Sequence, residues 1–234
     1  MVKDKIHIIS TASLPVEHLQ RLEQHGFEAE VIPFIRTYPS VSEESRQRIK
    51  KLEEQKATVV FTSVHGVAAV AEHIDRKVNW QIACIASATQ DAVIKHFDQS
   101  NVIATAPYAT QLAKELINHT AGPVAFFCGN KRLDTIPQQL QSAGITVEEI
   151  VVYHTELIPQ QVKEDADGIM FFSGSAVESF FMKNVLGKNT VCFAIGTTTA
   201  DALRERTGNK IVIAENPGKK EMTELVIQYY HEHS

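Results

Sequence analysis

Short apolar runs alternate along the chain with longer stretches in which apolar residues recur at helical spacing. The runs are rich in Val, Ile and Phe and predict strands, whereas the amphipathic stretches predict helices. The predicted strands are 5–10, 29–35, 57–62, 81–86, 102–105, 124–128, 149–154, 168–173, 191–195 and 210–214, and the predicted helices include 15–25, 43–55, 66–74, 109–118 and 136–143. This alternation is typical of βαβ units with parallel sheets. Because ten strands are many for one sheet in a chain of 234 residues, we predict two sheets.

An internal repeat organises the chain. The clearest match pairs VVFTSVHGVAAV, which begins at Val59, with IMFFSGSAVESF, which begins at Ile169. IASATQDAV pairs with IGTTTADAL, and VIATAP with VIAENP, at the same separation of 110 residues. A second match relates KIHIIS to VAFFCG and, at a separation of 118 residues, Gly26 to Gly144 and Thr37 to Thr155. We therefore expect two similar α/β domains that face each other across a cleft, with both glycines as left-handed helix caps.

Composition limits the classes of function. Hydrophobic residues make up 44% and charged residues 22%, and the net charge of −5 argues against a general nucleic-acid binder, which is normally basic. No stretch approaches the roughly 18 apolar residues of a membrane helix. The N-terminal MVKDKIHIIS has too short an apolar run for a signal peptide, so we expect a cytoplasmic protein. Cys84, Cys128 and Cys192 lie in or at the end of apolar runs and are predicted to be core thiols.

Hydroxyl residues follow several predicted strands. Ser63 and Ser173 occupy equivalent positions of the repeat, each before a helical run. Thr197, Thr198 and Thr199 follow Gly196, and the first half has Thr89 in the corresponding place. In parallel α/β units this is the carboxyl edge of the sheet, where ligands bind. Each residue could bind an anion through a helix start, or could simply cap the helix.

Two further features are candidates for chemistry. GNKR, from Gly129 to Arg132, places the cations Lys131 and Arg132 after a predicted strand, either for a ligand or as a solvated surface pair. Tyr153 lies in a predicted strand, and its phenol could donate a proton, although a strand tyrosine more often serves packing. The sequence has no GxGxxG motif, P-loop, GxSxG or CxxC, and its histidines do not cluster. We therefore expect no metal and no cofactor.

The chain resembles uroporphyrinogen-III synthases over nearly its full length. The matching segments occur in the family's order: FTSVHGV from Phe61, GNKRLDTIPQQLQSAGITVEEIVVYHT from Gly129, GIMFFSGSAVESF from Gly168, and IGTTTADAL from Ile195. The resemblance implies two parallel-sheet α/β domains joined by a two-stranded β linker. Domain one would combine residues 1–34 and 157–234, domain two would span 37–149, and the linker strands would lie near 31–36 and 150–155.

The resemblance also implies a reaction. Hydroxymethylbilane loses its terminal hydroxyl, the far pyrrole attacks through its substituted carbon, and the spiro intermediate recloses with ring D turned over. Without the enzyme the same bilane closes without inversion. Tyr153 matches the family tyrosine thought to assist departure of the hydroxyl. Residues that match the substrate-binding positions of the family cleft, or that add cations to it, are Ser63, Thr89, Lys131, Arg132, Ser173, Gly196, Thr198 and Thr199.

Several positions depart from the family pattern. The family often has Thr-Arg-Pro after the first strand, where this chain reads Ser10, Thr11 and Ala12, so Lys131 or Arg132 would have to supply a cation. His65 replaces a frequent asparagine, and Ala86 replaces a frequent glycine.

Other functions stay open at this point. The main alternative is a non-catalytic two-domain binder of a tetrapyrrole or another polyanion, and a third reading is a two-domain sugar or nucleotide transferase. If the chain is a synthase, we expect a monomer with a small tetrapyrrole substrate and transient contact with the enzyme that supplies it. We expect no contact with nucleic acid or membrane.

Overall fold

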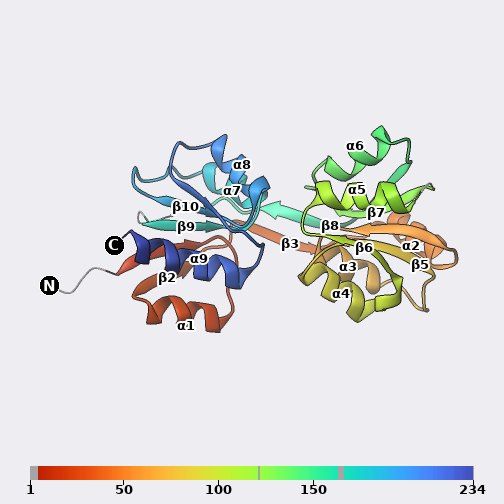
Figure 1. Ribbon diagram of the computed structural model, residues 1–234, viewed down its shortest axis with the longest axis horizontal. Coiled ribbons are helices and arrows are strands. Elements are labelled where there is room, and N and C mark those ends of the chain that lie inside the picture. Colours follow the sequence, from red (N-terminus) through yellow and green to blue (C-terminus); the bar gives the residue numbers. More distant parts are fainter. Residues whose placement is uncertain (1–4, 121, 163–165, 234) are drawn as a thin grey trace. The chain divides into compact units, whose positions relative to one another are not determined.

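The structure is a computed structural model that describes residues 5–120, 122–162 and 166–233. Its contacts divide the chain into two compact units (Figure 1). Unit 2 is the continuous segment Thr37–Thr155, and unit 1 combines the residues up to Arg36 with those from Glu156 onward. Unit 1 is therefore built from the two ends of the chain.

Unit 1 contains a five-stranded sheet in the described residues, with the order β11-β10-β9-β1-β2. Its neighbouring strands pair in parallel. The strands are β1 (Ile6–Ser10), β2 (Phe27–Val31), β9 (Gly168–Phe171), β10 (Val191–Ala194) and β11 (Ile211–Ile213). The helices are α1 (Val16–Gln24), α7 (Gly174–Phe181), α8 (Thr197–Arg204) and α9 (Lys219–Glu232).

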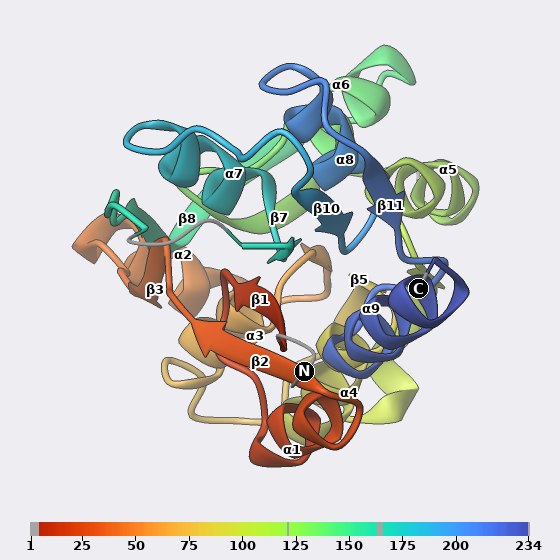
Figure 2. The same ribbon diagram turned by 90° about the vertical axis from the view of Figure 1, so that its left-hand side faces the viewer.

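Helices cover both faces of this sheet (Figures 1 and 2). Ile9 and Phe171 pack on the face covered by α7 and α8, whereas Ile8 and Met170 pack on the face covered by α1 and α9. Adjacent strand residues thus point to opposite faces, and both faces are apolar. This is the pattern of a parallel sheet between two helical layers.

Unit 2 has the same architecture. Its sheet has the order β3-β8-β7-β4-β5-β6, and its strands are β3 (Ile35–Pro39), β4 (Ala57–Phe61), β5 (Trp80–Ile85), β6 (Val102–Ala106), β7 (Val124–Gly129) and β8 (Val147–Leu157). The helices are α2 (Glu43–Glu53), α3 (Val64–Ala71), α4 (Ala88–His96), α5 (Ala109–His119) and α6 (Thr135–Ser142), with the short 3-10 turn η1 (Gln99–Asn101). One apolar cluster lies under α2, α3 and α4, and another under α5 and α6.

The strand orders give the sequence repeat a structural meaning. β11-β10-β9-β1-β2 corresponds strand by strand to β6-β5-β4-β7-β8. Ser63 and Ser173 are the N-caps of α3 and α7, directly after β4 and β9, which confirms their predicted equivalence. Gly26 and Gly144 have φ values of +86° and +78°, so the prediction of left-handed glycines after α1 and α6 is also confirmed.

One predicted strand is wrong. Residues 29–31 end β2 and Ile35 begins β3, and these two strands belong to different sheets. Pro33 lies between these strands and has no N–H to donate to a ladder. The strand that pairs with β8 is therefore Ile35–Pro39, displaced toward the C-terminus from the expected 31–36.

β3 and β8 run antiparallel. The Ser40 N–H donates to the Val152 carbonyl at 3.0 Å. The Ile158 N–H donates to the Phe34 carbonyl at 2.8 Å. Residue numbers therefore rise along β3 while those of the paired residues fall along β8, as in an antiparallel pair. The boundaries between the units at Arg36/Thr37 and Thr155/Glu156 fall within these two strands. At that boundary the hydroxyls of the repeat-related Thr37 and Thr155 are 3.2 Å apart.

The three cysteines are buried in strands, as predicted. Cys84, Cys128 and Cys192 belong to β5, β7 and β10, and none forms a disulfide. Burial raises the pKa of the Cys84 and Cys128 thiols to about 11 and that of Cys192 to about 12. These thiols are therefore protonated at neutral pH. Across the described residues, no helix combines the length and the apolar character that a bilayer crossing requires.

Candidate functional site

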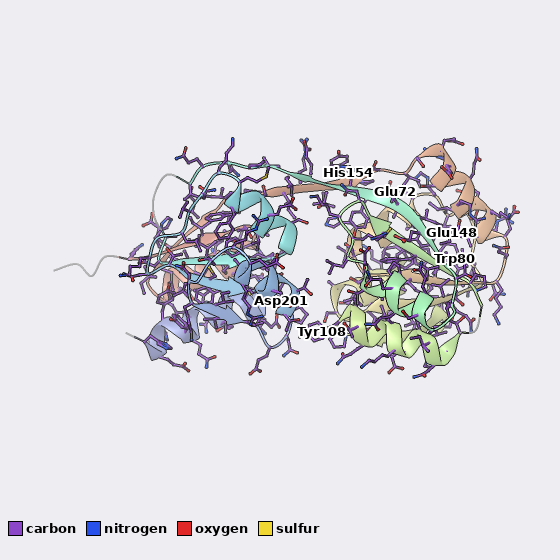
Figure 3. All side chains as sticks on the ribbon, turned by 90° about the horizontal axis from the view of Figure 1, so that it is seen from above. Glu72, Trp80, Tyr108, Glu148, His154 and Asp201 are labelled. Carbon is purple, nitrogen blue, oxygen red and sulfur yellow. The ribbon has the colours of Figure 1, made fainter. Side chains whose placement is uncertain are left out.

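Tyr153 lies near the carboxyl end of β8, beside the end of β7. The two strands pair in regular parallel register from Val124 to Cys128, and the register then shifts, so that Gly129 lies opposite Tyr153. Such an irregularity re-aims a side chain relative to the simple alternation of a strand. Tyr153 accordingly packs against the apolar cluster under α3 together with Val152, although the two residues are adjacent. The next residue, His154, is labelled on β8 in Figure 3.

Gly129 provides the space that the Tyr153 ring occupies. A Cβ atom at position 129 would lie 2.3 Å from Cε2, 2.6 Å from Cζ and 2.8 Å from Cδ2 of Tyr153. Gly66 in α3 borders the same ring, since a Cβ there would lie 3.6 Å from Cε1 of Tyr153. The ring is thus enclosed by backbone from β7 and α3. Its position depends on the absence of a side chain at 129.

The phenol of Tyr153 is half-buried beside the Ser63 side chain and the Gly129 N–H. Burial raises its pKa above the ordinary value, while the nearby Ser63 side chain and Gly129 N–H pull the pKa down by less. The phenol is therefore protonated at neutral pH. The nearby Ser63 side chain and Gly129 N–H favour the phenolate and so offset part of the effect of burial. The arrangement suits a weak acid that gives up a proton and tolerates the charge that remains.

His65 is the other titratable group beside Tyr153. Its ring centroid lies 5.9 Å from that of Tyr153 at an interplanar angle of 43°. Desolvation lowers the pKa of His65, so its imidazole is neutral at neutral pH. His65 also fixes Ser63, because its N–H donates to Ser63 Oγ at 3.2 Å. Tyr153, Ser63 and His65 therefore form one cluster at the carboxyl edge of the unit 2 sheet.

The matching edge of unit 1 carries the second group of candidate residues. Ser173 Oγ accepts a hydrogen bond from the Ala176 N–H at 3.1 Å. Gly196 precedes α8 at the end of the neighbouring strand β10, and Thr198 is exposed in the first turn. Unit 1 has Ile35 at the repeat position of Tyr153. The phenol therefore has no counterpart in unit 1.

Two candidate threonines are buried rather than exposed. Thr89 in α4 is 6% exposed and Thr199 in α8 is 3% exposed. Ser87, just before α4, has φ 65° and ψ −131°, a conformation that favours glycine. The departure from glycine at Ala86 thus coincides with a strained serine at the next residue. Strain of this kind costs about 1–3 kcal/mol.

The two candidate cations differ in their surroundings. Lys131 is exposed in the turn after β7. The Arg132 guanidinium pairs with Glu149 on β8 and with Asp134 before α6, and its side chain is 28% exposed. A ligand carboxylate at Arg132 would have to compete with these two carboxylates. Lys131 lacks the enclosing surface that would raise the strength of an ion pair.

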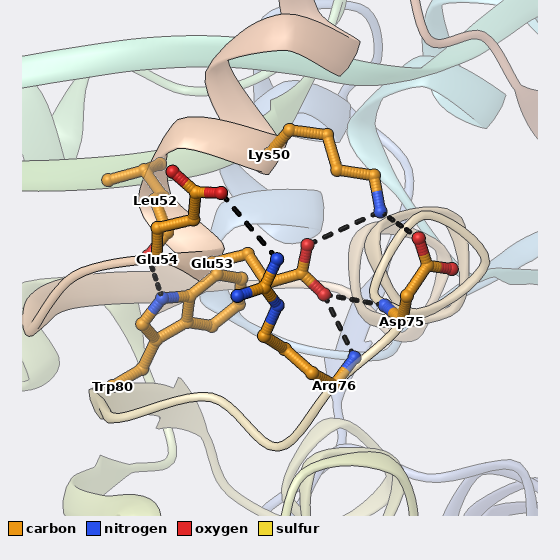
Figure 4. A network of polar contacts seen from close by, with 7 residues as sticks. All are labelled: Lys50, Leu52, Glu53, Glu54, Asp75, Arg76 and Trp80. Carbon is orange, nitrogen blue, oxygen red and sulfur yellow. Dashed lines mark hydrogen bonds and ion pairs between the residues drawn. The ribbon is translucent and has the colours of Figure 1, made fainter.

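A polar network lies on the opposite, amino-terminal side of the unit 2 sheet (Figure 4). Buried Glu53, at the end of α2, accepts hydrogen bonds from the N–H groups of Asp75 and Arg76 at 2.6 and 2.9 Å. Lys50 Nζ contacts Glu53 at 3.3 Å and Asp75 at 2.5 Å. Every oxygen of Glu53 is occupied by protein donors, so the network holds the loop before β5 in place. Among the described residues, no three His, Cys, Asp or Glu side chains gather as metal ligands would.

The sequence names Tyr153 and Ser63 as candidates but does not indicate the residues that hold the ring. GNKR was considered for its cations, whereas the geometry assigns importance to its glycine. The signal that could have revealed it is a glycine at the end of a buried strand, which often marks close approach of another group. His65 was noted as a departure but not as a neighbour of Tyr153. The register shift that brings these residues together is not visible in the sequence.

Comparisons with known proteins place the chain in a family. Residues 17–224 match the family model described as uroporphyrinogen-III synthase HemD. A mutant uroporphyrinogen III synthase from the extremely thermophilic bacterium Thermus thermophilus is 17% identical, with a TM-score of 0.69 over 97% of this chain and 98% of that one. The uroporphyrinogen-III synthetase from Helicobacter pylori is 17% identical, with a TM-score of 0.65 over 96% of this chain and 99% of that one. These structures share the fold, and the family match spans most of the sequence. The chain therefore belongs to the uroporphyrinogen-III synthase family.

Proposed function

We propose that the protein cyclises hydroxymethylbilane to uroporphyrinogen III with inversion of ring D, as a cyclising hydro-lyase in tetrapyrrole biosynthesis. The family match supports the overall reaction. The observation that carries the chemistry is the enclosed phenol of Tyr153, whose ring lies over Gly129 and whose pKa is raised by burial, so that it is protonated at neutral pH. A site of this kind can assist a poor leaving group without a strong acid.

The first step breaks the carbon–oxygen bond of the terminal hydroxymethyl group. Electrons from the adjacent pyrrole nitrogen displace the hydroxyl, and the Tyr153 phenol gives it a proton, so that water leaves and an azafulvenium cation and the Tyr153 phenolate remain. The far pyrrole then attacks through its substituted carbon to give a spiro intermediate. The bond between the spiro carbon and its original bridge then breaks and ring D recloses through its free carbon, and the ring proton lost as the aromatic pyrrole is restored returns to the Tyr153 phenolate. The net change is loss of one water.

Tyr153 is suited to the first step by its surroundings. Burial keeps the phenol protonated before the reaction. When the proton leaves, the nearby Ser63 side chain and Gly129 N–H favour the charged oxygen, which limits the rise of the pKa that burial causes. A positioned general acid accelerates such a step by roughly 10²–10⁴-fold. The rest of the acceleration comes from holding the bilane in a conformation in which the inverting attack is faster than direct closure.

The substrate is a polycarboxylate, and helix starts suit its carboxylates because their N–H groups point outward. We assign this binding to the starts of α3, α4, α7 and α8. The residues concerned are Ser63, Thr89, Ser173, Gly196, Thr198 and Thr199, with Lys131 and Arg132 as further cations. Buried Thr89 and Thr199 would act by shaping the helix start, and Arg132 would exchange a protein carboxylate for a substrate one. The proposal includes a cytoplasmic monomer that needs no cofactor and receives the bilane by transient contact with the enzyme that makes it.

The test is conversion of freshly made hydroxymethylbilane. We expect the purified protein to give the type III isomer, whereas the bilane alone gives type I, and chromatography of the oxidised products separates the two. Tyr153→Phe should slow type III formation by roughly 10²-fold, at the low end of general-acid effects because the pyrrole also expels the hydroxyl. The loss of one hydroxyl should cost about 1 kcal/mol of stability.

Two controls make the result decisive. Thermal unfolding measured on both proteins separates a slow folded variant from an unfolded one. Tyr229→Phe, near the C-terminal end of α9, removes a hydroxyl from a ring that packs on Phe193 and His233 and should leave the rate unchanged. A wild-type protein that binds the bilane but yields only type I would favour the non-catalytic binder. A Tyr153→Phe variant as fast as wild type would make Tyr153 a packing residue.

A further inference from the structure

Asn130 contacts three consecutive residues of β8. Its backbone N–H donates to the Tyr153 carbonyl at 3.3 Å. Its side-chain Nδ2 lies 3.1 Å from Nε2 of His154. Its Oδ1 accepts from the Thr155 N–H at 2.7 Å, and Nδ2 donates to the Thr155 carbonyl at 3.3 Å. One residue at the end of β7 thus bonds the backbone on both sides of His154 as well as its ring.

These contacts lie where the sheet loses its regular register. The β7–β8 ladder shifts between Cys128 and Gly129, so strand pairing alone no longer fixes the direction of the residues that follow. The Asn130 amide presents an acceptor to the Thr155 N–H and a donor to its carbonyl, as a further strand residue would. Reversing the amide would oppose like groups at both contacts, so the orientation is determined by the bonds themselves.

The position of Tyr153 depends on this segment of β8. Its ring lies over Gly129 with no space for a Cβ atom there, so a small rotation of the β8 backbone would move the phenol away from Ser63. His154 is held from the other side as well, because its ring stacks on Tyr38 of β3 with centroids 5.7 Å apart and an interplanar angle of 28°. Asn130 therefore links the ends of β7 and β8 at the residue that carries the phenol.

We propose that Asn130 is a positioning residue, which fixes the end of β8 after the register shift and so holds the Tyr153 phenol over Gly129 beside Ser63. The expected effect of Asn130 on catalysis rests on the proposed function, whereas its effect on the position of the Tyr153 ring does not. Asn130 itself touches neither the phenol nor, in this account, the substrate. Its effect passes through Tyr153.

The first experiment is a double-mutant cycle in the bilane assay. Asn130→Ala should lower kcat by roughly ten- to hundredfold, the effect of a displacement of about 1 Å at a reacting group, with a smaller change in KM. In the Tyr153→Phe background the same substitution should change kcat by less than about threefold, because the group it positions is already gone. Asn130→Asp keeps the acceptor for the Thr155 N–H and should recover much of the loss.

A second experiment does not depend on activity. The ring of Tyr153 over Gly129 should shift the Gly129 α-proton resonances, and NMR should show this shift in wild type and in Tyr153→Phe, which keeps the ring. In Asn130→Ala the shift should move toward ordinary glycine values. Asn101→Ala is the matched control, since Asn101 Nδ2 bridges the carbonyls of Val78 and Trp80 at 3.3 and 2.8 Å at the other edge of the same sheet.

Asn101→Ala should lower stability and leave both kcat and the Gly129 resonances unchanged. Gly129 resonances that are identical in wild type and Asn130→Ala would overturn the proposal, whether or not the protein makes the type III isomer. Additive losses in the double-mutant cycle would also overturn it. Absence of type III product from wild type would refute the proposed function, while the resonances would still decide the role of Asn130. If Asn130→Ala does not fold, Asn130→Asp provides both measurements with smaller expected changes.

Discussion

The space above Gly129 determines where the Tyr153 ring can lie. The ring atoms occupy the place that any Cβ at 129 would need, at distances down to 2.3 Å. The resulting pocket is built from backbone of β7 and α3, which is more rigid than a pocket of long side chains. The phenol is therefore held over Gly129 and near the Ser63 side chain. At the residue scale, the chemistry of the site therefore depends on the lack of a side chain at Gly129 as well as on the side chains of Tyr153 and Ser63.

Gly129→Ala should therefore mimic the loss of the phenol. The added methyl group would displace the ring, and we expect kcat to fall by roughly 10²-fold, as for a reacting group moved by about 1 Å. Gly208→Ala is the control, because a Cβ there meets nothing within 4 Å. Combining Gly129→Ala with Tyr153→Phe should add little further loss, and steady-state kinetics of the four proteins measures this. A Gly129→Ala variant with full activity would show that the ring can act from another position.

At the scale of elements, the two edges of the unit 2 sheet differ in structure. The carboxyl edge has exposed helix starts and the half-buried phenol, whereas at the amino edge a network of hydrogen bonds joins the end of α2 to the loop before β5. Glu53 shows this best, because it joins the end of α2 to the loop before β5 (Figure 4). Burial alone would raise the pKa of Glu53, but the N–H groups of Asp75 and Arg76 and the Lys50 ammonium together hold its pKa below the ordinary value.

Glu53→Gln should lower the free energy of unfolding by about 1–3 kcal/mol, since it removes a buried charge that accepts strong hydrogen bonds. A carboxylate with a lowered pKa in the folded state stabilises the protein above its unfolded-state pKa, here 4.5. The difference between wild type and Glu53→Gln should thus be constant near neutrality and shrink as the pH falls below about 4.5.

Denaturant unfolding at several pH values measures this. Glu54→Gln is the matched control, because Glu54 is exposed and its ion pair with Arg76 at 3.5 Å is solvated. Its effect should stay below about 1 kcal/mol. Equal effects of the two substitutions at neutral pH would contradict the assigned role of Glu53.

At the scale of the whole molecule, the repeat explains how one chain makes two similar units. Unit 2 is one continuous segment. In unit 1 the strands that correspond to β4, β5 and β6 are β9, β10 and β11, in the later part of the chain. The strands that correspond to β7 and β8 are β1 and β2, at the start of the chain. The connection from α5 to β7 in unit 2 corresponds in unit 1 to the two chain ends. Unit 1 is thus a circularly permuted copy of unit 2 with respect to the order of its strands.

This organisation predicts that Thr37–Thr155 folds alone. The segment contains its own sheet and two apolar clusters, and it contains Trp80, the single tryptophan, which is 2% exposed. The expressed segment should unfold in one cooperative transition, with Trp80 emission moving to longer wavelength. A chain that runs from residue 156 to 232 and, through a short glycine–serine linker, on to residues 6–36 should likewise fold, as circular dichroism can show. A gradual change in Trp80 emission without a transition would contradict the prediction for unit 2.

The sequence predicts the local features of this fold better than those that depend on residues distant in the chain. The strands, the two sheets, the left-handed glycines and the equivalence of Ser63 and Ser173 all come from local patterns that repeat. The sequence does not show that residues 29–35 divide between two sheets, because the choice of partner for β3 depends on β8, more than a hundred residues away. Tyr153 was identified by resemblance, yet strand alternation alone would place it on the face opposite Val152.

The sequence by itself determined the α/β class, the duplication and the apolar faces, because hydrophobic periodicity and turn residues act over a few positions. The tertiary structure decided which ends of strands meet. It brought Gly129, Asn130 and Ser63 to Tyr153, buried Thr89 and Thr199, and paired Arg132 with carboxylates. The physical reason is that register, side-chain direction and ion pairing are set by neighbours distant in the chain, whose positions exist only once the sheet has formed.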